Sequence, residues 1–300
     1  MQTILGANGQ IAIELAKELK RNYTSEIRLV SRNPVKVNDS DTIFPADLLD
    51  KDLTDKAVKE SEIAYLTIGF PMDTELWLKV FPVVMRNVID ACIKYDVKLV
   101  FFDNTYMYPQ NSEPLTEETL FDPVGKKGEV RAEITNMLLE EMESKSINAV
   151  ICRAPEFYGP DKTQSITNGM IFRNIEKNRT LRVLLKDDTL RTLIWTPDAS
   201  KATALLGNSN DAYGETWHLP CDDNRLTYKQ FIGYASEVVG RGLPYDILNK
   251  DDVANEELIE LLPRYEEHNI FDSSKFKRWF PDFKVTTYKE GIEYIINGMK

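Results

Sequence analysis

The chain has 300 residues, of which 42% are hydrophobic and 28% are charged, a composition typical of soluble globular proteins. Its 37 basic and 48 acidic residues give a formal net charge of −11, so it has no electrostatic footprint for nucleic acid or an anionic membrane. It contains no apolar run as long as a transmembrane helix and no signal peptide at its start, so we expect a cytoplasmic protein.

Disulfide and metal chemistry are not expected from the cysteines and histidines. Cys92, Cys152 and Cys221 are an odd number without metal-ligand spacing, and they predict reduced, mostly buried thiols. His218 and His268 are the only histidines, too few for a histidine-based metal site. We therefore predict no metal.

The first twelve residues predict a dinucleotide site. A short apolar strand enters the glycine turn Gly6-x-x-Gly9-x-x-Ala12, and a helical apolar pattern begins directly after it. Glycine allows the tight turn and the close approach of a pyrophosphate, and a small third residue lets the helix pack against the strand. The helix N-terminus then presents unpaired amides to the phosphates. The cofactor-binding residues expected here are Gly6, Asn8, Gly9, Gln10 and Ile11.

The order of the predicted elements indicates an α/β protein with a Rossmann-type doubly wound parallel sheet. Strands are expected at 26–31, 42–46, 63–68, 98–102 and 149–152, and helices at 52–59, 74–95 and 127–144. We expect residues 1–155 to form an NAD(P)-binding domain.

Beyond residue 155 the pattern changes, and we expect residues 156–300 to form a smaller α/β substrate-side domain over the carboxyl edge of the sheet, with some later segments returning to the first domain. The expected helices lie near 165–178, 198–207, 227–239 and 251–267, and the expected strands near 181–185, 190–195 and 215–219.

The segment after the second strand bears on the choice of cofactor. An acidic residue there would favour NAD, whereas an arginine accommodates the 2′-phosphate of NADP. This chain has Ser31-Arg32-Asn33-Pro34 and no acid. Because guanidinium geometry suits phosphate, we predict that Arg32 binds NADP, with NAD as the alternative.

Further motifs follow in order along nearly the whole chain. They are Ala46-Asp47-Leu48, Leu66-Thr67-Ile68-Gly69, Asp103-Asn104-Thr105-Tyr106-Met107-Tyr108, Arg153-Ala154-Pro155-Glu156-Phe157-Tyr158-Gly159-Pro160 and Asp272-Ser273-Ser274-Lys275. With the glycine turn, this series resembles the extended short-chain dehydrogenase/reductase superfamily of the NAD-dependent epimerase/dehydratase type. The resemblance implies further cofactor contacts from Asp47, Leu48, Thr67, Gly69 and Pro155.

The chain departs from this family at the helix that carries its Tyr-x-x-x-Lys pair, in which the lysine lowers the pKa of the phenol. No tyrosine is present there. The register with the best apolar match puts Lys127 and Arg131 at the two positions, and a register shifted by two residues puts Gly125 and Glu129 there. The chain's only Tyr-x-x-x-Lys, Tyr158–Lys162, contains glycine and proline, so no continuous helical face is expected.

Other groups are candidates to replace the missing acid. The family serine position falls on Asn104, with Thr105 beside it, and both side chains can hydrogen-bond a substrate oxygen. Tyr106 and Tyr108 are the best available phenols, although we favour packing beneath the cofactor as their role. The candidate catalytic residues are therefore Asn104, Thr105, Tyr106, Lys127 and Arg131.

The resemblance implies an NAD(P)-dependent oxidoreductase or epimerase that acts on a small polar or nucleotide-sugar substrate. Arg191 is a candidate for binding an anionic substrate group. The alternative is a non-catalytic NADP-binding sensor or regulatory protein, which kept the cofactor site and lost its proton donor. The resemblance also implies a homodimer through the helices at 74–95 and 127–144.

Overall fold

A computed structural model describes residues 1–160 and 163–299, and its contacts divide the chain into two compact units. Unit 1 contains Met1–Met107, Pro123–Ala154 and Ala199–Leu219. Unit 2 contains Tyr108–Asp122, Pro155–Asp198 and Pro220–Lys300. The chain therefore leaves the first unit and returns to it twice.

Unit 1 is built on a seven-stranded sheet in which every neighbouring pair is parallel. Its strands are β1 (Gln2–Leu5), β2 (Ile27–Ser31), β3 (Thr42–Pro45), β4 (Ile63–Leu66), β5 (Lys98–Asp103), β6 (Ala149–Arg153) and β11 (Thr216–His218). The spatial order β11-β6-β5-β4-β1-β2-β3 reverses its progression between β1 and β4. This confirms the predicted doubly wound α/β fold, and such sheets bind ligands at the carboxyl ends of the strands beside the reversal.

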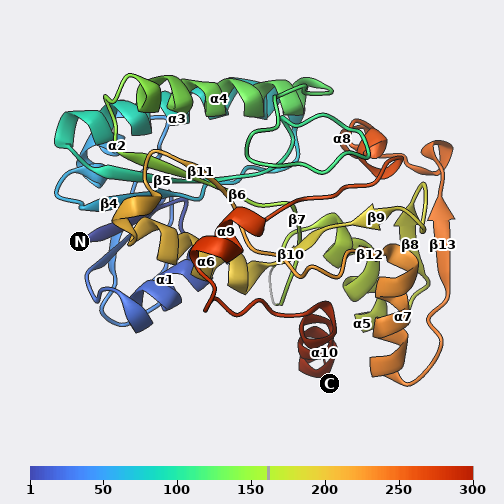
Figure 1. Ribbon diagram of the computed structural model, residues 1–300. Helices are drawn as coiled ribbons and strands as arrows, with labels where there is room; N and C mark the ends of the chain where they lie inside the picture. The colour runs from blue at the N-terminus through green and yellow to red at the C-terminus, as the bar shows by residue number, and fades with distance from the viewer. Residues whose placement is uncertain (161–162, 300) are drawn as a thin grey trace. The chain divides into compact units, whose positions relative to one another are not determined.

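Helices cover both faces of this sheet, with α2, α3 and α4 on one face and α1 and α6 on the other (Figure 1). The helices are α1 (Gln10–Asn22), α2 (Lys51–Val58), α3 (Thr74–Tyr95), α4 (Lys126–Glu143) and α6 (Thr196–Gly207), followed by a 3₁₀ turn (Asn210–Ala212). Apolar side chains of the strands, α3 and α4 form one buried cluster that includes Val88, Phe101 and Ile134. No helix in the described ranges is long and apolar enough to cross a membrane.

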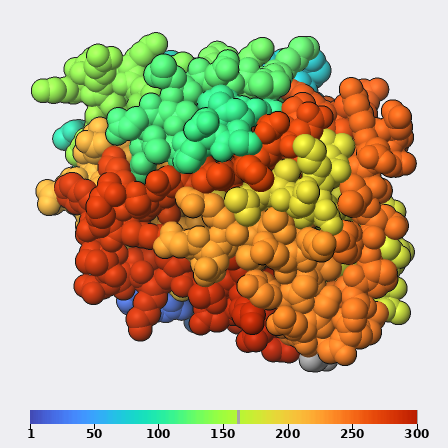
Figure 2. All heavy atoms as spheres, turned by 45° about the vertical axis from the view of Figure 1, so that its right-hand side comes forward, coloured from blue at the N-terminus to red at the C-terminus, as the bar shows by residue number. Residues whose placement is uncertain are grey.

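Unit 2 consists of short elements around an aromatic core that includes Tyr158, Phe231 and Tyr288. Its strands are β7 (Glu156–Tyr158), β8 (Leu181–Leu184), β9 (Leu190–Arg191), β10 (Leu193–Trp195), β12 (Leu226–Thr227) and β13 (Tyr245–Leu248). Its helices are a π-helix (Asn168–Phe172), α5 (Arg173–Glu176), α7 (Tyr228–Val239), 3₁₀ turns (Lys250–Asp252 and Leu262–Tyr265), α8 (Glu256–Ile259), α9 (Ser274–Trp279) and α10 (Tyr288–Gly298). The strands pair as β10–β7, β12–β9 and β13–β8, and yellow and orange segments of this unit lie side by side in Figure 2.

The structure adds detail to the expectations for the second half of the chain. The strand expected near 215–219 forms as β11 and pairs with β6 in the sheet of unit 1. The strand expected over 190–195 is split, because β9 pairs with β12 and β10 pairs with β7. The helical segment expected near 251–267 forms only in part, as α8 flanked by two 3₁₀ turns. Pro263, which has no amide hydrogen, lies in the first turn of the last of them.

All three cysteines are free and buried, two of them in unit 1. Cys92 lies on α3 and Cys152 lies in β6. Burial in the apolar core raises the pKa of both thiols far above the ordinary value. Within the described part of the chain, no group of three or more His, Cys, Asp or Glu residues could hold a metal ion.

We expect these two thiols to make the protein less stable in alkaline solution. They stay protonated in the folded state, whereas unfolded thiols ionise near pH about 8.5. Their stabilising effect is therefore fully present below that pH. Above it, urea denaturation should show the free energy of unfolding falling by up to about 1.4 kcal/mol per thiol per pH unit. A Cys92→Ala/Cys152→Ala variant should show a flatter pH dependence. Rapid reaction of these thiols with a thiol reagent in native buffer would contradict the prediction.

Candidate active site and cofactor-binding site

The glycine turn lies at the carboxyl end of β1, beside the reversal point of the sheet. Gly6 has a φ of +100°, and a Cβ atom there would lie 2.6 Å from the Cα atom of Ile68. The amides of Gly6 and Ala7 both donate to the carbonyl of Val30 at 2.9 Å. The turn is thus held between β2 and the segment that follows β4, and only glycine fits at position 6.

The N-terminus of α1 is open to a phosphate ligand. Gly9 is the N-cap residue, and no described side chain caps the helix. Among the described residues, a Cβ atom on Gly9 would meet only the Gly6 carbonyl, at 3.8 Å, and the buried Nε2 of Gln10 has no hydrogen-bond partner. Ile11 is buried, and its carbonyl accepts from the Ser200 hydroxyl at 3.1 Å. Uncapped amides at the positive end of a helix bind phosphates, so these residues fit a pyrophosphate.

Two further predicted contacts, Asn8 and Arg32, lie close to this turn. Arg32 directly follows β2, is exposed, and has no hydrogen-bond or ion-pair partner within the described residues. Asn8 bonds the backbone of the same loop, since its Nδ2 donates to the Asn33 carbonyl at 2.7 Å. Arg32 therefore has a free guanidinium at the carboxyl edge of the sheet.

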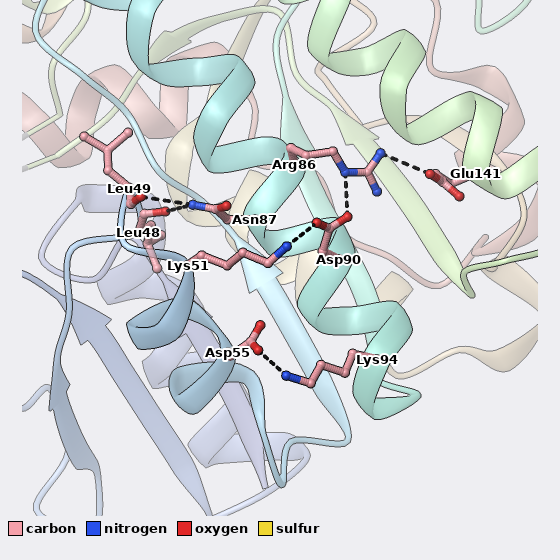
Figure 3. Close-up of polar contacts among 9 residues, drawn as sticks. All are labelled: Leu48, Leu49, Lys51, Asp55, Arg86, Asn87, Asp90, Lys94 and Glu141. Atoms are coloured by element: carbon pink, nitrogen blue, oxygen red, sulfur yellow. Dashed lines mark hydrogen bonds and ion pairs between the residues drawn. The ribbon is translucent and has the colours of Figure 1, made fainter.

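The Asp47–Leu48 segment follows β3 and is held by α3. Asn87 donates from Nδ2 to the carbonyls of Leu48 and Leu49, at 2.9 and 3.2 Å (Figure 3). The Leu48 side chain is buried, whereas the Asp47 side chain is exposed and accepts from the Leu49 amide at 3.1 Å. The helix thus fixes the backbone and leaves the Asp47 carboxylate at the surface.

Thr67 lies beside the glycine turn, while Gly69 and Pro155 have other surroundings. The Thr67 amide donates to the Leu5 carbonyl at 2.9 Å, and its hydroxyl contacts the same oxygen at 3.3 Å. Gly69 is exposed, and a Cβ atom there would have nothing within 4 Å, so packing does not require glycine. Pro155 is buried in unit 2.

A buried ion cluster lies at the carboxyl ends of β5 and β6. Asp103 accepts from Nη2 of Arg131 through Oδ1, and from Nε of Arg153 through Oδ2 at 3.2 Å. The Thr135 hydroxyl also donates to Oδ2, at 3.1 Å. The charged side chains are at most 5% exposed. These four residues, which we call the Asp103 cluster, bind α4 to the edge of the sheet.

Arg131 takes the position at which the resemblance places a lysine, but its contacts are those of a structural residue. Its guanidinium lies over the rings of Phe81 and Phe101, 5.0 and 5.4 Å from their centroids, and donates to Asp103. These contacts direct its charge to the junction of helix and sheet. Sequence reasoning did not identify Asp103 as its partner, although a lone acid ending a mostly apolar strand is a usable signal.

Lys127 takes the tyrosine position in the same register, and it is also buried. Its Nζ donates to the Thr74 hydroxyl at 2.5 Å. At the next residue, a Cβ atom on Gly128 would lie 2.7 Å from the Tyr106 carbonyl. The first turn of α4 therefore packs directly against the loop that follows β5, where the other candidate catalytic residues lie.

The second register, with Gly125 and Glu129, places only one functional side chain on α4. Gly125 is the N-cap residue of α4, with a φ of +79°, and Glu129 is exposed in the first turn. In the separate Tyr158–Lys162 pair, Tyr158 is buried in unit 2 and Lys162 lies outside the described residues. Only the first register brings two buried cations to α4.

The loop after β5 presents one free polar group and one stacked phenol. Asn104 donates its amide to Asp103 Oδ1 at 2.8 Å and accepts from the Tyr106 amide at 3.0 Å. Nδ2 of Asn104 has no partner within the described residues and can donate to a substrate oxygen. Thr105 is buried. The Tyr106 ring stacks on Trp77, with centroids 5.9 Å apart and an interplanar angle of 18°.

Two other candidates take part in buried hydrogen bonds within unit 2. The Tyr108 hydroxyl donates to the Thr116 carbonyl at 3.0 Å. Arg191 is buried and donates to Glu156 at 3.0 Å. Burial, the largest single effect, lowers the pKa of Arg191, but the charges of Glu156, Tyr265 and Tyr228 and the hydrogen bond to Glu156 together outweigh it, so the net shift is upward. The Arg191 cation is therefore already balanced by a carboxylate.

We expect Asp103→Asn to lower the free energy of unfolding by about 3–5 kcal/mol, because two buried guanidinium groups lose their shared carboxylate. Asp90→Asn is the matched control. Asp90 pairs with Lys51 at 3.0 Å and Arg86 at 2.7 Å near the surface of α3 (Figure 3), so its loss should cost under about 1 kcal/mol. Urea unfolding curves measure both effects, and equal losses would show that the Asp103 cluster is no stronger than a surface pair.

Solved structures of other proteins share this architecture. The UDP-glucuronic acid 4-epimerase from Bacillus cereus, in complex with NAD, matches with a TM-score of 0.81 at 16% identity over 100% of this chain and 97% of that one. The UDP-glucose 4-epimerase from Thermus thermophilus, also with NAD, gives 0.80 at 16%, over 100% and 99%. A putative epimerase from Burkholderia cenocepacia gives 0.83 at 16%, over 99% and 97%.

At such low identity these structures establish the fold, whereas the family follows from the sequence model. No curated protein sequence gives a match. The model described as the NAD dependent epimerase/dehydratase family matches residues 3–219, which include the glycine turn, α4 and β11. The chain therefore belongs to the NAD-dependent epimerase/dehydratase family.

Proposed function

We propose that this protein is an NAD(P)-dependent oxidoreductase or epimerase that acts on a small polar substrate such as a nucleotide sugar. The observation that carries the proposal is the turn at Gly6, which leads to the uncapped amides of α1 beside the reversal point of the sheet. Family membership and the nucleotide-sugar epimerases of the same fold support the same class of reaction.

In this proposal the residues around the glycine turn bind and orient the cofactor. The α1 amides hold the pyrophosphate, and Asp47 contacts the adenine. A bound nicotinamide supplies a position that accepts or returns a hydride. Arg32 binds the 2′-phosphate, which makes NADP the preferred cofactor. This preference rests on the free guanidinium of Arg32, and the NAD in the two relatives does not decide it at 16% identity.

The loop after β5 and the first turn of α4 act on the substrate in this proposal. Asn104 donates from Nδ2 to a substrate oxygen, with Thr105 beside it. Proton transfer belongs to Tyr106 or Lys127, which lie on the segments brought together at Gly128. Arg131 holds α4 in place through Asp103, so another group must set the pKa of the proton donor.

The second candidate function is a non-catalytic NADP-binding sensor or regulatory protein. It is favoured by one observation: α4 contains no tyrosine, and its Arg131, where the resemblance in the favoured register places a lysine, is bound to Asp103. A protein of this kind would bind NADPH and turn over no substrate.

For the cofactor, we expect Arg32→Asp to weaken NADPH binding by about tenfold or more and NADH binding by less than about threefold, because only NADPH carries the 2′-phosphate. Titration of reduced-nicotinamide fluorescence measures both affinities. Lys36→Asp is the matched control, since it makes the same charge change on the same loop, where Lys36 donates to the Asp39 carbonyl. Equal weakening by the two substitutions would refute a specific contact.

For catalysis, we expect NADPH oxidation with one member of a panel of carbonyl compounds and nucleotide sugars. Tyr106→Phe keeps the ring that stacks on Trp77 and removes only the hydroxyl, and Lys127→Ala removes the amine. The variant that lacks the proton donor should lose about 100-fold or more in turnover. A thermal melt separates this loss from unfolding, which is necessary because Lys127 is buried. Tight NADPH binding with no turnover on any compound would favour the sensor.

A further inference from the structure

Asn8 connects the glycine turn to the loop that follows β2. Its φ is +80°, in the left-handed region that asparagine tolerates better than most residues. Its Nδ2 donates to the Asn33 carbonyl at 2.7 Å and lies 3.4 Å from the Ser31 hydroxyl. Its Oδ1 accepts from the Val35 amide at 3.0 Å. One side chain thus bonds backbone groups on both sides of Pro34.

The two strong bonds use both ends of the amide, and this restricts which residue can replace asparagine. The Asn33 carbonyl requires a donor and the Val35 amide requires an acceptor, so the amide orientation is fixed. Aspartate at position 8 would still accept from Val35 but would place an oxygen against the Asn33 carbonyl. Glycine would keep the backbone conformation and make neither bond.

The position of Arg32 depends on this bonding. Arg32 lies between Ser31, where β2 ends, and Asn33, which Asn8 holds. Since Arg32 itself has no hydrogen-bond or ion-pair partner within the described residues, the backbone on either side sets where its side chain begins. The far end of the loop has a separate anchor, because Asn38 donates to the Ala16 carbonyl at 3.1 Å.

We propose that Asn8 is a positioning residue for cofactor choice. By ordering residues 31–35, it holds Arg32 where the 2′-phosphate of NADP binds, and so it favours NADP over NAD without touching that phosphate. The inference rests on the proposed function, in which the glycine turn binds the cofactor and Arg32 binds the 2′-phosphate.

A double-mutant cycle of Asn8→Gly and Arg32→Ala tests this role, with NADPH and NADH affinities measured by nicotinamide fluorescence. We expect Asn8→Gly to weaken NADPH binding by about five- to tenfold and NADH binding by less than about twofold. In the Arg32→Ala background, the same substitution should change NADPH binding by less than about twofold, because the group it positions is gone. Asn38→Ala, at the other anchor of the loop, should leave the ratio of the two affinities unchanged.

The outcomes distinguish failure of the inference about Asn8 from failure of the proposed function. Equal weakening of both cofactors by Asn8→Gly, or additive losses in the double variant, overturns the inference and leaves the binding of a dinucleotide intact. A wild-type protein that binds neither cofactor overturns the proposed function and the inference together. If Asn8→Gly does not fold, Asn8→Asp takes its place in the cycle, since it keeps the bond from Val35 and loses the donor to Asn33.

Discussion

The carboxylate of Asp103 is the constraint on which the candidate catalytic region depends. One anion binds a guanidinium from α4 and another from β6, and it also accepts the amide that begins the Asn104 loop. Because the three charges are buried, the loss of any one of them would leave buried charge uncompensated and would destabilise the protein. The loop that is expected to meet the substrate therefore takes its position from an ion cluster that is itself shielded from solvent.

Close backbone packing is a second constraint at the same sheet edge. At Gly6 on the cofactor side, and at Gly128 beside the loop that follows β5, backbone approaches backbone so closely that a single added carbon atom would not fit. The parallel sheet brings Gly6 and Gly128 to one edge, since the carboxyl ends of all seven strands lie there. Residues that are 122 positions apart in the sequence (128 − 6) consequently form one region of unit 1.

Much of unit 1 could be predicted because its signals are local. The helix at Thr74–Tyr95 forms with the predicted bounds, since its apolar residues recur at helical spacing over 22 residues. The order of strands and helices likewise follows from the alternation of short apolar runs and amphipathic segments.

The remaining features depend on pairings between distant residues. Nothing in residues 215–219 indicates that their strand joins β6 rather than a strand of unit 2. The acidic stretch at 251–267 has helical spacing, but it forms one short helix and two 3₁₀ turns in place of a single helix. The hydrogen-bond partners of Arg131 and Asn8 could not be predicted for the same reason. These partners, Asp103 and Val35, lie 28 and 27 positions away in the sequence.

The Asp103 cluster also limits how this chain can change. A Tyr-x-x-x-Lys pair in the favoured register would require Lys127→Tyr and Arg131→Lys. The second change would replace a planar guanidinium, held over two aromatic rings, by a compact ammonium that cannot match its geometry. The buried charges thus tie the identity of residue 131 to the sheet beneath it.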